Sequence, residues 1–218
     1  MHIPDGFLDP WIITLTFALS VVFWIVALRR VRRSFGDRHV PVLAVMTAGI
    51  FAAQMINWPV GPGGTTAHLI GGPLIAAYLG PSGGIVALSI VLVIQAFFFS
   101  DGGLTALGAN VLNMAIIDVI AGYYLFRFVS RLMGDTPRGK VVGAFIGGWL
   151  GITLAAAACG LEIGLSSQFP YGWVLSLPIM TLYHGFLGII EGIITASVVG
   201  YTLSARPDLL GLPKAKLT

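Results

Sequence analysis

The sequence predicts an all-α fold, a polytopic membrane helical bundle of about seven transmembrane helices with its N-terminus outside. Three observations predict it: 56% of the 218 residues are hydrophobic, only 10% are charged, and the mean hydropathy is +0.91. A soluble domain carries about a quarter of charged residues. A chain of this length also has too much surface to hide so apolar a composition from water. The same composition excludes a disordered chain, which would be poor in apolar residues.

The positively charged residues indicate how the chain is oriented. All 12 Lys and Arg residues fall into three clusters, at Arg29–Arg38, Arg127–Lys140 and Arg206–Lys216. Positive residues in short loops stay on the cytoplasmic side of a membrane, so the three clusters should share that face. An even number of crossings must therefore separate each cluster from the next. These loops are expected to meet lipid headgroups of the bilayer, and no nucleic-acid partner is predicted.

Seven apolar stretches are the predicted spans: Trp11–Leu28, Val40–Ile56, Ala67–Leu79, Ile85–Phe99, Leu104–Phe126, Val141–Leu161 and Trp173–Leu203. The first is long enough to cross a bilayer and precedes the first basic cluster, which places the N-terminus outside and the C-terminus in the cytoplasm. The Ala67–Leu79 stretch is too short to span unaided, so it is tilted or partly re-entrant. Pro178 marks a kink in the last span or its true start. Two crossings between the first two clusters, or six spans plus a re-entrant segment, are the alternatives.

The first two residues can chelate a metal ion. The free α-amine of Met1, the backbone amide nitrogen of His2 and its near ring nitrogen close a five-membered and a six-membered ring around one ion. Three nitrogens then lie nearly in a plane, with one corner open. Such a set favours Ni(II) or Cu(II), and low-spin Co(II) also fits it. The simpler interpretation is a terminal histidine without a function.

His68 is the candidate for the open corner. It ends the loop Gly61–His68, on the same predicted face of the membrane as Met1. A loop rich in Gly and Pro survives at membrane depth only where it lines a cavity or is buried in protein. His68 could therefore supply a fourth nitrogen, and the alternative is a loop histidine bonded to a carbonyl.

These residues carry a family resemblance. The segments Met1–Gly6, Gly64–His68 with Asn57, and Asp101–Asn110 resemble the substrate-capture (S) subunit of cobalt/nickel energy-coupling-factor (ECF) importers, the CbiM/NikM type. The resemblance covers nearly the whole chain. It implies capture of one Co2+ or Ni2+ ion from outside by the nitrogens of Met1, His2 and His68, with a slight preference for Co2+. The loop reads Thr-Thr-Ala-His where Thr-Ser-Gly-His is frequent in relatives, a departure that bears on metal preference.

The resemblance also implies partners and a location. It implies a transmembrane coupling (T) subunit, cytoplasmic ATPase subunits and a small accessory membrane protein, in a prokaryotic plasma (inner) membrane. The chain itself is not expected to be an enzyme or to hold a prosthetic group. Its near-match to a phosphate-binding loop at 134–141 has Val141 where Ser or Thr would bind Mg2+. ATP hydrolysis is therefore expected on a separate partner.

Other polar residues at membrane depth need a reason, because an ionisable group there is a functional candidate by default. Asn57, Asp101 and Asn110 are candidates to support the N-terminal segment, with Asp101 accepting backbone N–H groups. His184 and Glu191, seven residues apart on one helix face, could form a second support, a proton path or a structural contact. An intramembrane zinc-dependent hydrolase using His184 and Glu191 is one alternative function, and a passive metal channel is another.

The chain is expected to form one integral membrane domain, residues 1–218. Residues 1–10 are its metal-chelating N-terminal segment and residues 204–218 its cytoplasmic tail. The start lacks the basic residues of a secretory signal peptide, so no cleavage is expected. The single cysteine, Cys159, excludes an intrachain disulfide and a two-cysteine metal motif.

Overall fold

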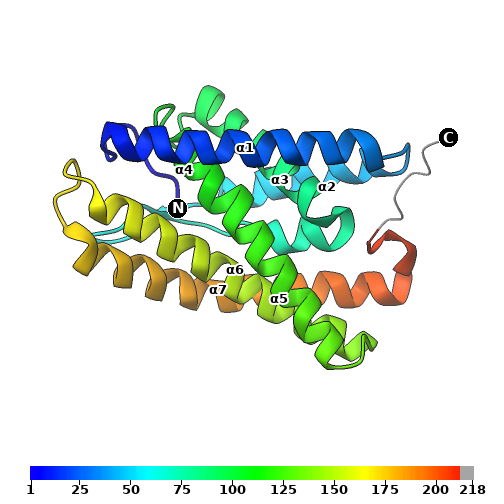
Figure 1. Ribbon diagram of the computed structural model, residues 1–218. Coiled ribbons are helices and arrows are strands. Elements are labelled where there is room, and N and C mark those ends of the chain that lie inside the picture. Colours follow the sequence, from blue (N-terminus) through cyan, green and yellow to red (C-terminus); the bar gives the residue numbers. More distant parts are fainter. Residues whose placement is uncertain (212–218) are drawn as a thin grey trace.

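The computed structural model describes residues 1–211 and shows a bundle of long apolar helices (Figure 1). The elements in chain order are α1 (Pro10–Ser34), α2 (His39–Gln54), β1 (Trp58–Pro59), β2 (Thr66–Ala67), α3 (Gly72–Phe99), α4 (Leu107–Asn110), the π-helix η1 (Val111–Ile117), α5 (Asp118–Leu132), α6 (Pro137–Leu165), α7 (Gly172–Ala205) and the 3-10 helix η2 (Pro207–Leu209). α1 lies along one side of the bundle, and α6 and α7 lie side by side along the other.

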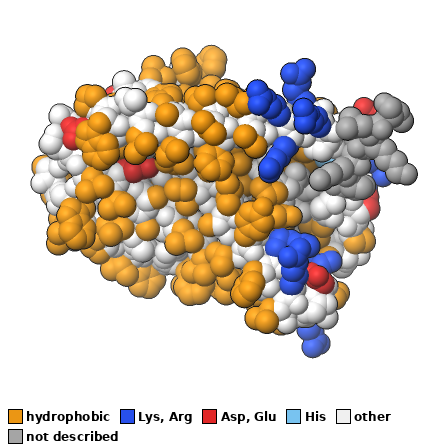
Figure 2. All heavy atoms as spheres, viewed as in Figure 1, with side chains coloured by type: hydrophobic (Ala, Val, Ile, Leu, Met, Phe, Trp, Pro, Cys, Tyr) orange, Lys and Arg blue, Asp and Glu red, His pale blue; other side chains and the backbone are white. Residues whose placement is uncertain are grey.

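Within residues 1–211, five stretches of helix are long and apolar enough to cross a membrane. They are α1, α3, α6, α7 and the continuous helix Leu107–Leu132, which α4, η1 and α5 form together. α2 is apolar but shorter, with 16 residues. Large apolar side chains cover the outside of the bundle (Figure 2), as hydrocarbon requires and water would not favour. The predicted membrane-type helical bundle is confirmed.

The helix count differs from the seven that were expected, because the predicted spans Ala67–Leu79 and Ile85–Phe99 belong to one element, α3. Helix begins only at Gly72, and Ala67 lies in β2. Between the two predicted spans the helix is interrupted at Gly80, with φ 71° and ψ 172°, a conformation that only glycine adopts readily. Pro81 follows and lacks an N–H, which suits the first turn of a new helical stretch. The two halves therefore join without the intervening loop that the sequence suggested.

The other predicted boundaries hold approximately. Pro178 lies inside α7 and is not its start. α7 continues to Ala205, so the predicted tail at 204–218 begins inside helix, and its residues 212–218 lie outside the described residues. α6 and α7 pack closely because Gly192 has no side chain. A Cβ at that position would lie 2.7 Å from the carbonyl oxygen of Phe145. The Lys and Arg side chains that are visible in Figure 2 gather at one end of the bundle.

Candidate metal centre

The N-terminus is folded into the interior of the bundle. Met1 and Ile3 are fully buried and His2 is 2% exposed. The Asn110 side chain holds Ile3 on both sides: its Oδ1 accepts the Ile3 N–H at 2.8 Å and its Nδ2 donates to the Ile3 carbonyl at 3.1 Å. Asn110, a predicted support residue, therefore fixes the N-terminal segment as an added strand would.

The loop after α3 covers this segment. The Gly103 N–H donates to the Ile3 carbonyl at 2.8 Å, and the Asp5 carboxylate accepts the Thr105 N–H at 2.7 Å. A Cβ on Gly103 would lie 2.3 Å from the Asp5 backbone nitrogen. Gly102 has φ +94°, and a Cβ there would lie 3.1 Å from His2 Nδ1. Two glycines thus allow the loop to lie directly against the terminus.

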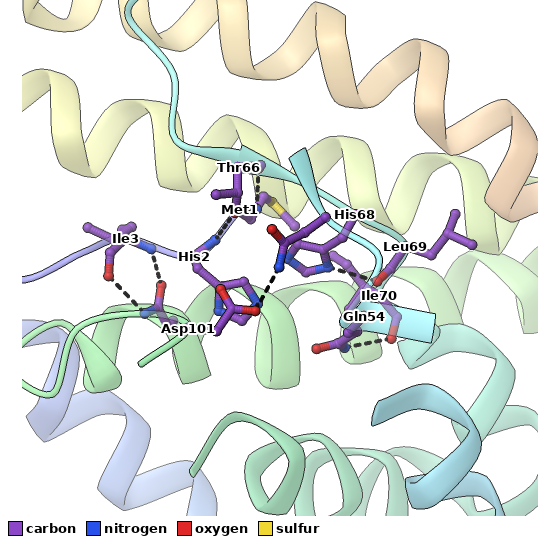
Figure 3. Close-up of polar contacts among 11 residues, drawn as sticks. Met1, His2, Ile3, Gln54, Thr66, His68, Leu69, Ile70 and Asp101 are labelled. Carbon is purple, nitrogen blue, oxygen red and sulfur yellow. Dashed lines mark hydrogen bonds and ion pairs between the residues drawn. The ribbon is translucent and has the colours of Figure 1, made fainter. Parts of the chain in front are cut away.

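Thr66 of β2 binds both backbone nitrogens of the N-terminus (Figure 3). The Met1 amine donates to the Thr66 carbonyl oxygen and, at 3.0 Å, to Thr66 Oγ1. The His2 N–H donates to the same Oγ1, also at 3.0 Å. One threonine therefore faces the two nitrogens that begin the expected chelate.

His68 lies beside His2, as Figure 3 shows. The two rings are stacked, with centroids 4.5 Å apart and an interplanar angle of 27°. His68 Nδ1 is 2.8 Å from the Leu69 carbonyl oxygen, which can only accept, so the ring proton is on Nδ1 and Nε2 carries a lone pair. Within the described residues this buried Nε2 has no hydrogen-bond partner. It is the kind of nitrogen that a metal ion takes as a ligand.

Burial sets the protonation of the N-terminal nitrogens. Burial lowers the pKa of the Met1 amine from 8.0 to about 5, so at neutral pH the amine carries a free lone pair. Burial, and then the nearby amine, also lower the pKa of the His2 ring. Metal ligands must be deprotonated. Both groups are therefore in the form that binds metal.

Asp101 lies at the edge of this cluster. Its Oδ2 accepts a hydrogen bond from Asn57 Nδ2 at 2.8 Å and is 3.6 Å from His2 Nε2. Burial raises the pKa of Asp101, and the Met1 amine in its protonated form and the Asn57 hydrogen bond oppose that shift. The structure differs here from the expected backbone support, because the N-terminal N–H groups are held by Thr66 and Asn110 instead. A cavity of about 330 Å³ opens beside His2 and includes Asp101 in its wall.

His184 and Glu191 lie on α7 and do different things. His184 Nδ1 donates to the Met180 carbonyl at 2.9 Å, four residues earlier on the same helix. Glu191 accepts the N–H groups of Ile70 and Gly71, each at 2.8 Å. No group of three His, Cys, Asp or Glu side chains suited to a metal ion occurs within residues 1–211. The side-chain set that a zinc hydrolase would need is not among the described residues.

Three contributors to the site could not be given a role from the sequence. Thr66 stands inside the quoted motif, but a threonine beside a histidine carries no signal of its own. Gln54 donates to the Ile70 carbonyl at 3.0 Å, and Asp118 accepts the Gly72 N–H at 3.1 Å. Their only signal is a polar group in an apolar span, and that signal does not name a partner.

Comparison with known proteins identifies the family. The family model described as "Cobalt uptake substrate-specific transmembrane region", CbiM, matches residues 2–209. The chain belongs to the CbiM family. A relative named "Putative fused nickel transport protein NikMN", from Archaeoglobus fulgidus, is 48% identical over 96% of this chain and 68% of its own length. A putative metal transport protein of Haloquadratum walsbyi is 47% identical over 96% of this chain and 93% of its own length.

A solved structure of a similar protein has the same fold. It is a truncated transition metal transporter, 40% identical in sequence, with a TM-score of 0.87 over 94% of this chain and 99% of its own. The CbiM family is one of transition metal uptake proteins, so the resemblance predicted from the sequence is confirmed. The chain is a transport protein and not an enzyme, and the hydrolase alternative is wrong.

Proposed function

We propose that this CbiM-family chain captures one Co2+ or Ni2+ ion on the outer face of the membrane, as the substrate-binding subunit of an ATP-driven ECF importer. The observation that carries the proposal is the burial of the N-terminal amine, the His2 amide and His68 in one polar pocket of an apolar bundle. The ligands are the Met1 amine, the His2 amide nitrogen and ring Nδ1, and His68 Nε2. The ion is the cargo and not a resident cofactor.

Binding requires one movement of the rings. Nitrogen lone pairs lie in the plane of an imidazole ring, whereas the His2 and His68 rings lie face to face. One ring must therefore turn its nitrogen edge toward the other to share an ion. His2 Nδ1 closes the six-membered chelate ring, which leaves Nε2–H directed to Asp101. A carboxylate that accepts this N–H orients the ring and makes it a stronger ligand.

We propose Co2+ as the preferred ion, by a small margin. A planar set of four nitrogens suits Ni(II) by geometry. The family description names cobalt, whereas the name of the Archaeoglobus relative gives nickel. Competition between the two ions decides this point directly.

The helix α3 supports a topology of seven crossings. Gly80 lies near the basic end of the bundle: a Cβ on the neighbouring Gly83 would lie 2.8 Å from the Phe35 ring, which follows α1. On the other side of Gly80, the Ala77 carbonyl accepts the Gly211 N–H at 2.9 Å, after the end of α7. Both flanks of Gly80 thus contact segments at the basic end.

Gly80 divides α3 into two stretches, and the ends of these stretches that lie away from Gly80 come together near His2. Thr66 precedes the first stretch and Asp101 follows the second, and both lie beside His2. The chain therefore runs from the N-terminal site to the basic end and returns. With α2, this gives four crossings between the first two basic clusters and seven in all. The positive-inside rule then puts the N-terminus outside and the C-terminus in the cytoplasm of a prokaryotic plasma membrane.

The proposed partners are a transmembrane coupling (T) subunit, cytoplasmic ATPases and a small accessory membrane protein. The Archaeoglobus relative is named as a fused protein, and this chain matches 68% of its length, which supports a division of the transporter into parts. A passive channel would instead move the ion without an ATPase. Uptake into cells that lack the ATPase subunits separates these two functions: the proposal expects none.

The chelate is tested with the purified protein and the metal alone. The chain with its native start, and the same chain with one alanine added before Met1, are loaded with equimolar Co2+ and Ni2+. We expect one ion per chain in the native form and none in the extended form, by metal analysis and visible absorption. His39→Ala, a histidine at the N-terminus of α2 bonded to Gly36 N–H, is the matched control and should bind normally. Equal binding by both starts would overturn the proposal.

A further inference from the structure

The Thr66 hydroxyl lies close to the position that an ion bound to the N-terminal nitrogens would take. Its Oγ1 is 3.0 Å from the Met1 amine nitrogen and 3.0 Å from the His2 amide nitrogen, and it accepts from both. A hydroxyl oxygen has two lone pairs, so both contacts can be satisfied at once. Thr66 also lines the cavity beside His2, so an ion arriving through that cavity meets this side chain.

A metal bound to the His2 amide nitrogen takes the direction of the lost N–H bond, because that nitrogen stays planar. Metal–nitrogen bonds are about 2 Å long. The N–H points at Thr66 Oγ1 only 3.0 Å away, so an ion at bonding distance from the nitrogen would press against that oxygen. The amine binds an ion through its lone pair and not along an N–H bond, but it also donates to Oγ1, so moving the hydroxyl breaks that hydrogen bond too. The hydroxyl and the ion are therefore alternative partners of the amide nitrogen.

We infer that the Thr66 hydroxyl is a placeholder, which binds the amine and amide of the N-terminus until the ion displaces it. This inference rests on the proposed chelate. Buried N–H groups without a partner are costly, so the placeholder stabilises the folded terminus before metal arrives. Rotation about χ1 moves the hydroxyl to another staggered position, while the pairing of β2 with β1 holds the Thr66 backbone.

The placeholder lowers the affinity for the cargo. An arriving ion must break two hydrogen bonds, and a departing ion is replaced by them. For a transport protein this has a use, because a cargo bound too tightly cannot be released. The Thr66 carbonyl still accepts from the amine when the hydroxyl has moved, so the terminus keeps its anchor on β2.

Substitutions at Thr66 give opposite signs for a placeholder and a ligand. We expect Thr66→Ala to bind Ni2+ about tenfold more tightly by isothermal titration, since two hydrogen bonds no longer compete. Its melting temperature should fall without metal and match that of the wild type with metal. The visible spectrum of bound Ni2+ should not change, because no ligand is lost. Thr66→Ser keeps the hydroxyl and should behave as the wild type.

Two further variants keep the test decisive. Thr66→Val fills the same volume as threonine without a hydroxyl acceptor, and it should show the same gain in affinity as Thr66→Ala. It also replaces that variant in the test if Thr66→Ala folds poorly. Thr65→Ala removes a neighbouring hydroxyl that lies 4.0 Å from the sulfur atoms of Cys159 and Met180, and it should leave the affinity unchanged. Weaker binding or a shifted spectrum in Thr66→Ala would make the hydroxyl a ligand and overturn the placeholder. Unchanged binding by the extended N-terminus would instead overturn the chelate itself.

Discussion

The segment from Thr66 to Gly72 has two halves that treat their polar groups differently. In the outer half, His68 Nε2 is buried without a hydrogen-bond partner in the described chain. In the inner half, Glu191 accepts the N–H groups of Ile70 and Gly71, and Asp118 accepts that of Gly72. The Ile70 carbonyl accepts from Gln54. One half has spare lone pairs, and the other has its backbone N–H groups bound by side chains.

The difference separates binding from support. Backbone that leaves a helix at membrane depth must find partners in the protein, and carboxylates from α5 and α7 supply them. Backbone N–H groups that are paired in this way have no donor left for a ligand. A buried nitrogen without a partner would be a defect in a purely structural region. We therefore propose that the outer half binds the ion and that the inner half holds it in position.

Replacing His68 should give the largest effect. We expect His68→Ala to weaken Co2+ and Ni2+ binding more than about a hundredfold. Loss of a ligand should cost more than loss of a group that only supports a ligand, which is about 10- to 100-fold. The melting temperature of the metal-free protein should also fall, because the substitution removes a fully buried ring and its Nδ1 hydrogen bond to the Leu69 carbonyl. Isothermal titration and thermal unfolding check the two parts. A large loss of stability with a normal affinity would assign His68 to the support.

The pH dependence should come from the nitrogen ligands of Met1 and His2. Burial lowers the pKa of the Met1 amine from 8.0 to about 5, so above pH 5 the amine is already neutral and releases no proton. The His2 amide releases one proton when it binds the ion, so affinity should rise about tenfold per pH unit between about pH 6 and 8. Below about pH 5 the amine is protonated and must also release a proton, so the affinity should fall more steeply there.

Titrations of Ni2+ at several pH values measure that slope. A flat profile would remove the amide from the ligand set. A slope of two up to pH 8 would mean that the Met1 amine keeps its ordinary pKa and is not buried before the ion binds. Glu191→Gln should change neither the affinity nor this slope, since the Glu191 carboxylate accepts backbone N–H groups of the inner half.

Glu191→Gln should act mainly on stability. Glutamine keeps one acceptor oxygen, but its NH2 group faces the second N–H, so one backbone donor loses its partner. We expect a loss of about 1–3 kcal/mol in the free energy of unfolding, equal with and without metal. Glu162→Gln is the matched control, because Glu162 accepts a hydrogen bond from Asn113 Nδ2 at 2.6 Å and glutamine can still accept it. A loss confined to the metal-bound form would place Glu191 in the binding half.

Sequence reasoning predicted the N-terminal chelate and His68 more fully than the contacts of the inner half. The N-terminal chelate is a property of adjacent atoms in one chain, so it can be read from Met1 and His2 without a fold. His68 needed the topology of the spans and the family motif. The contacts of Glu191 with Gly71 and of Asp118 with Gly72 join residues 120 and 46 positions apart. Helical periodicity places a carboxylate on a face but does not say which backbone group lies opposite.

The fold was predictable to a similar degree. Long apolar runs identify most helices because hydrocarbon demands them. The sequence around Gly80 and Pro81 reads as a loop, since Gly and Pro are the residues of turns. The same two residues also allow a sharp break inside one helical element, and only packing against neighbouring segments distinguishes the two. The extended stretch before Gly72 was read as part of a span because its apolar residues carry no sign of strand or helix.

Replacing Asp101 should give the smallest effect on affinity, because Asp101 lies beside the proposed ligand His2 without being a ligand itself. Its Oδ2 is 3.6 Å from His2 Nε2 and accepts from Asn57. Asp101→Asn keeps an oxygen for Asn57 but loses the charge that faces the His2 ring. We expect Ni2+ affinity to fall about tenfold, the lower end of the range for groups that orient a ligand. The visible spectrum should keep its shape, because the four nitrogens remain.

Asp9→Asn is the control for this prediction. Asp9 is a carboxylate near the same terminus that accepts from Ser167 N–H at 2.8 Å, and its replacement should not change the affinity. A changed spectrum would make Asp101 a ligand, and equal losses in both variants would reduce its effect to general charge.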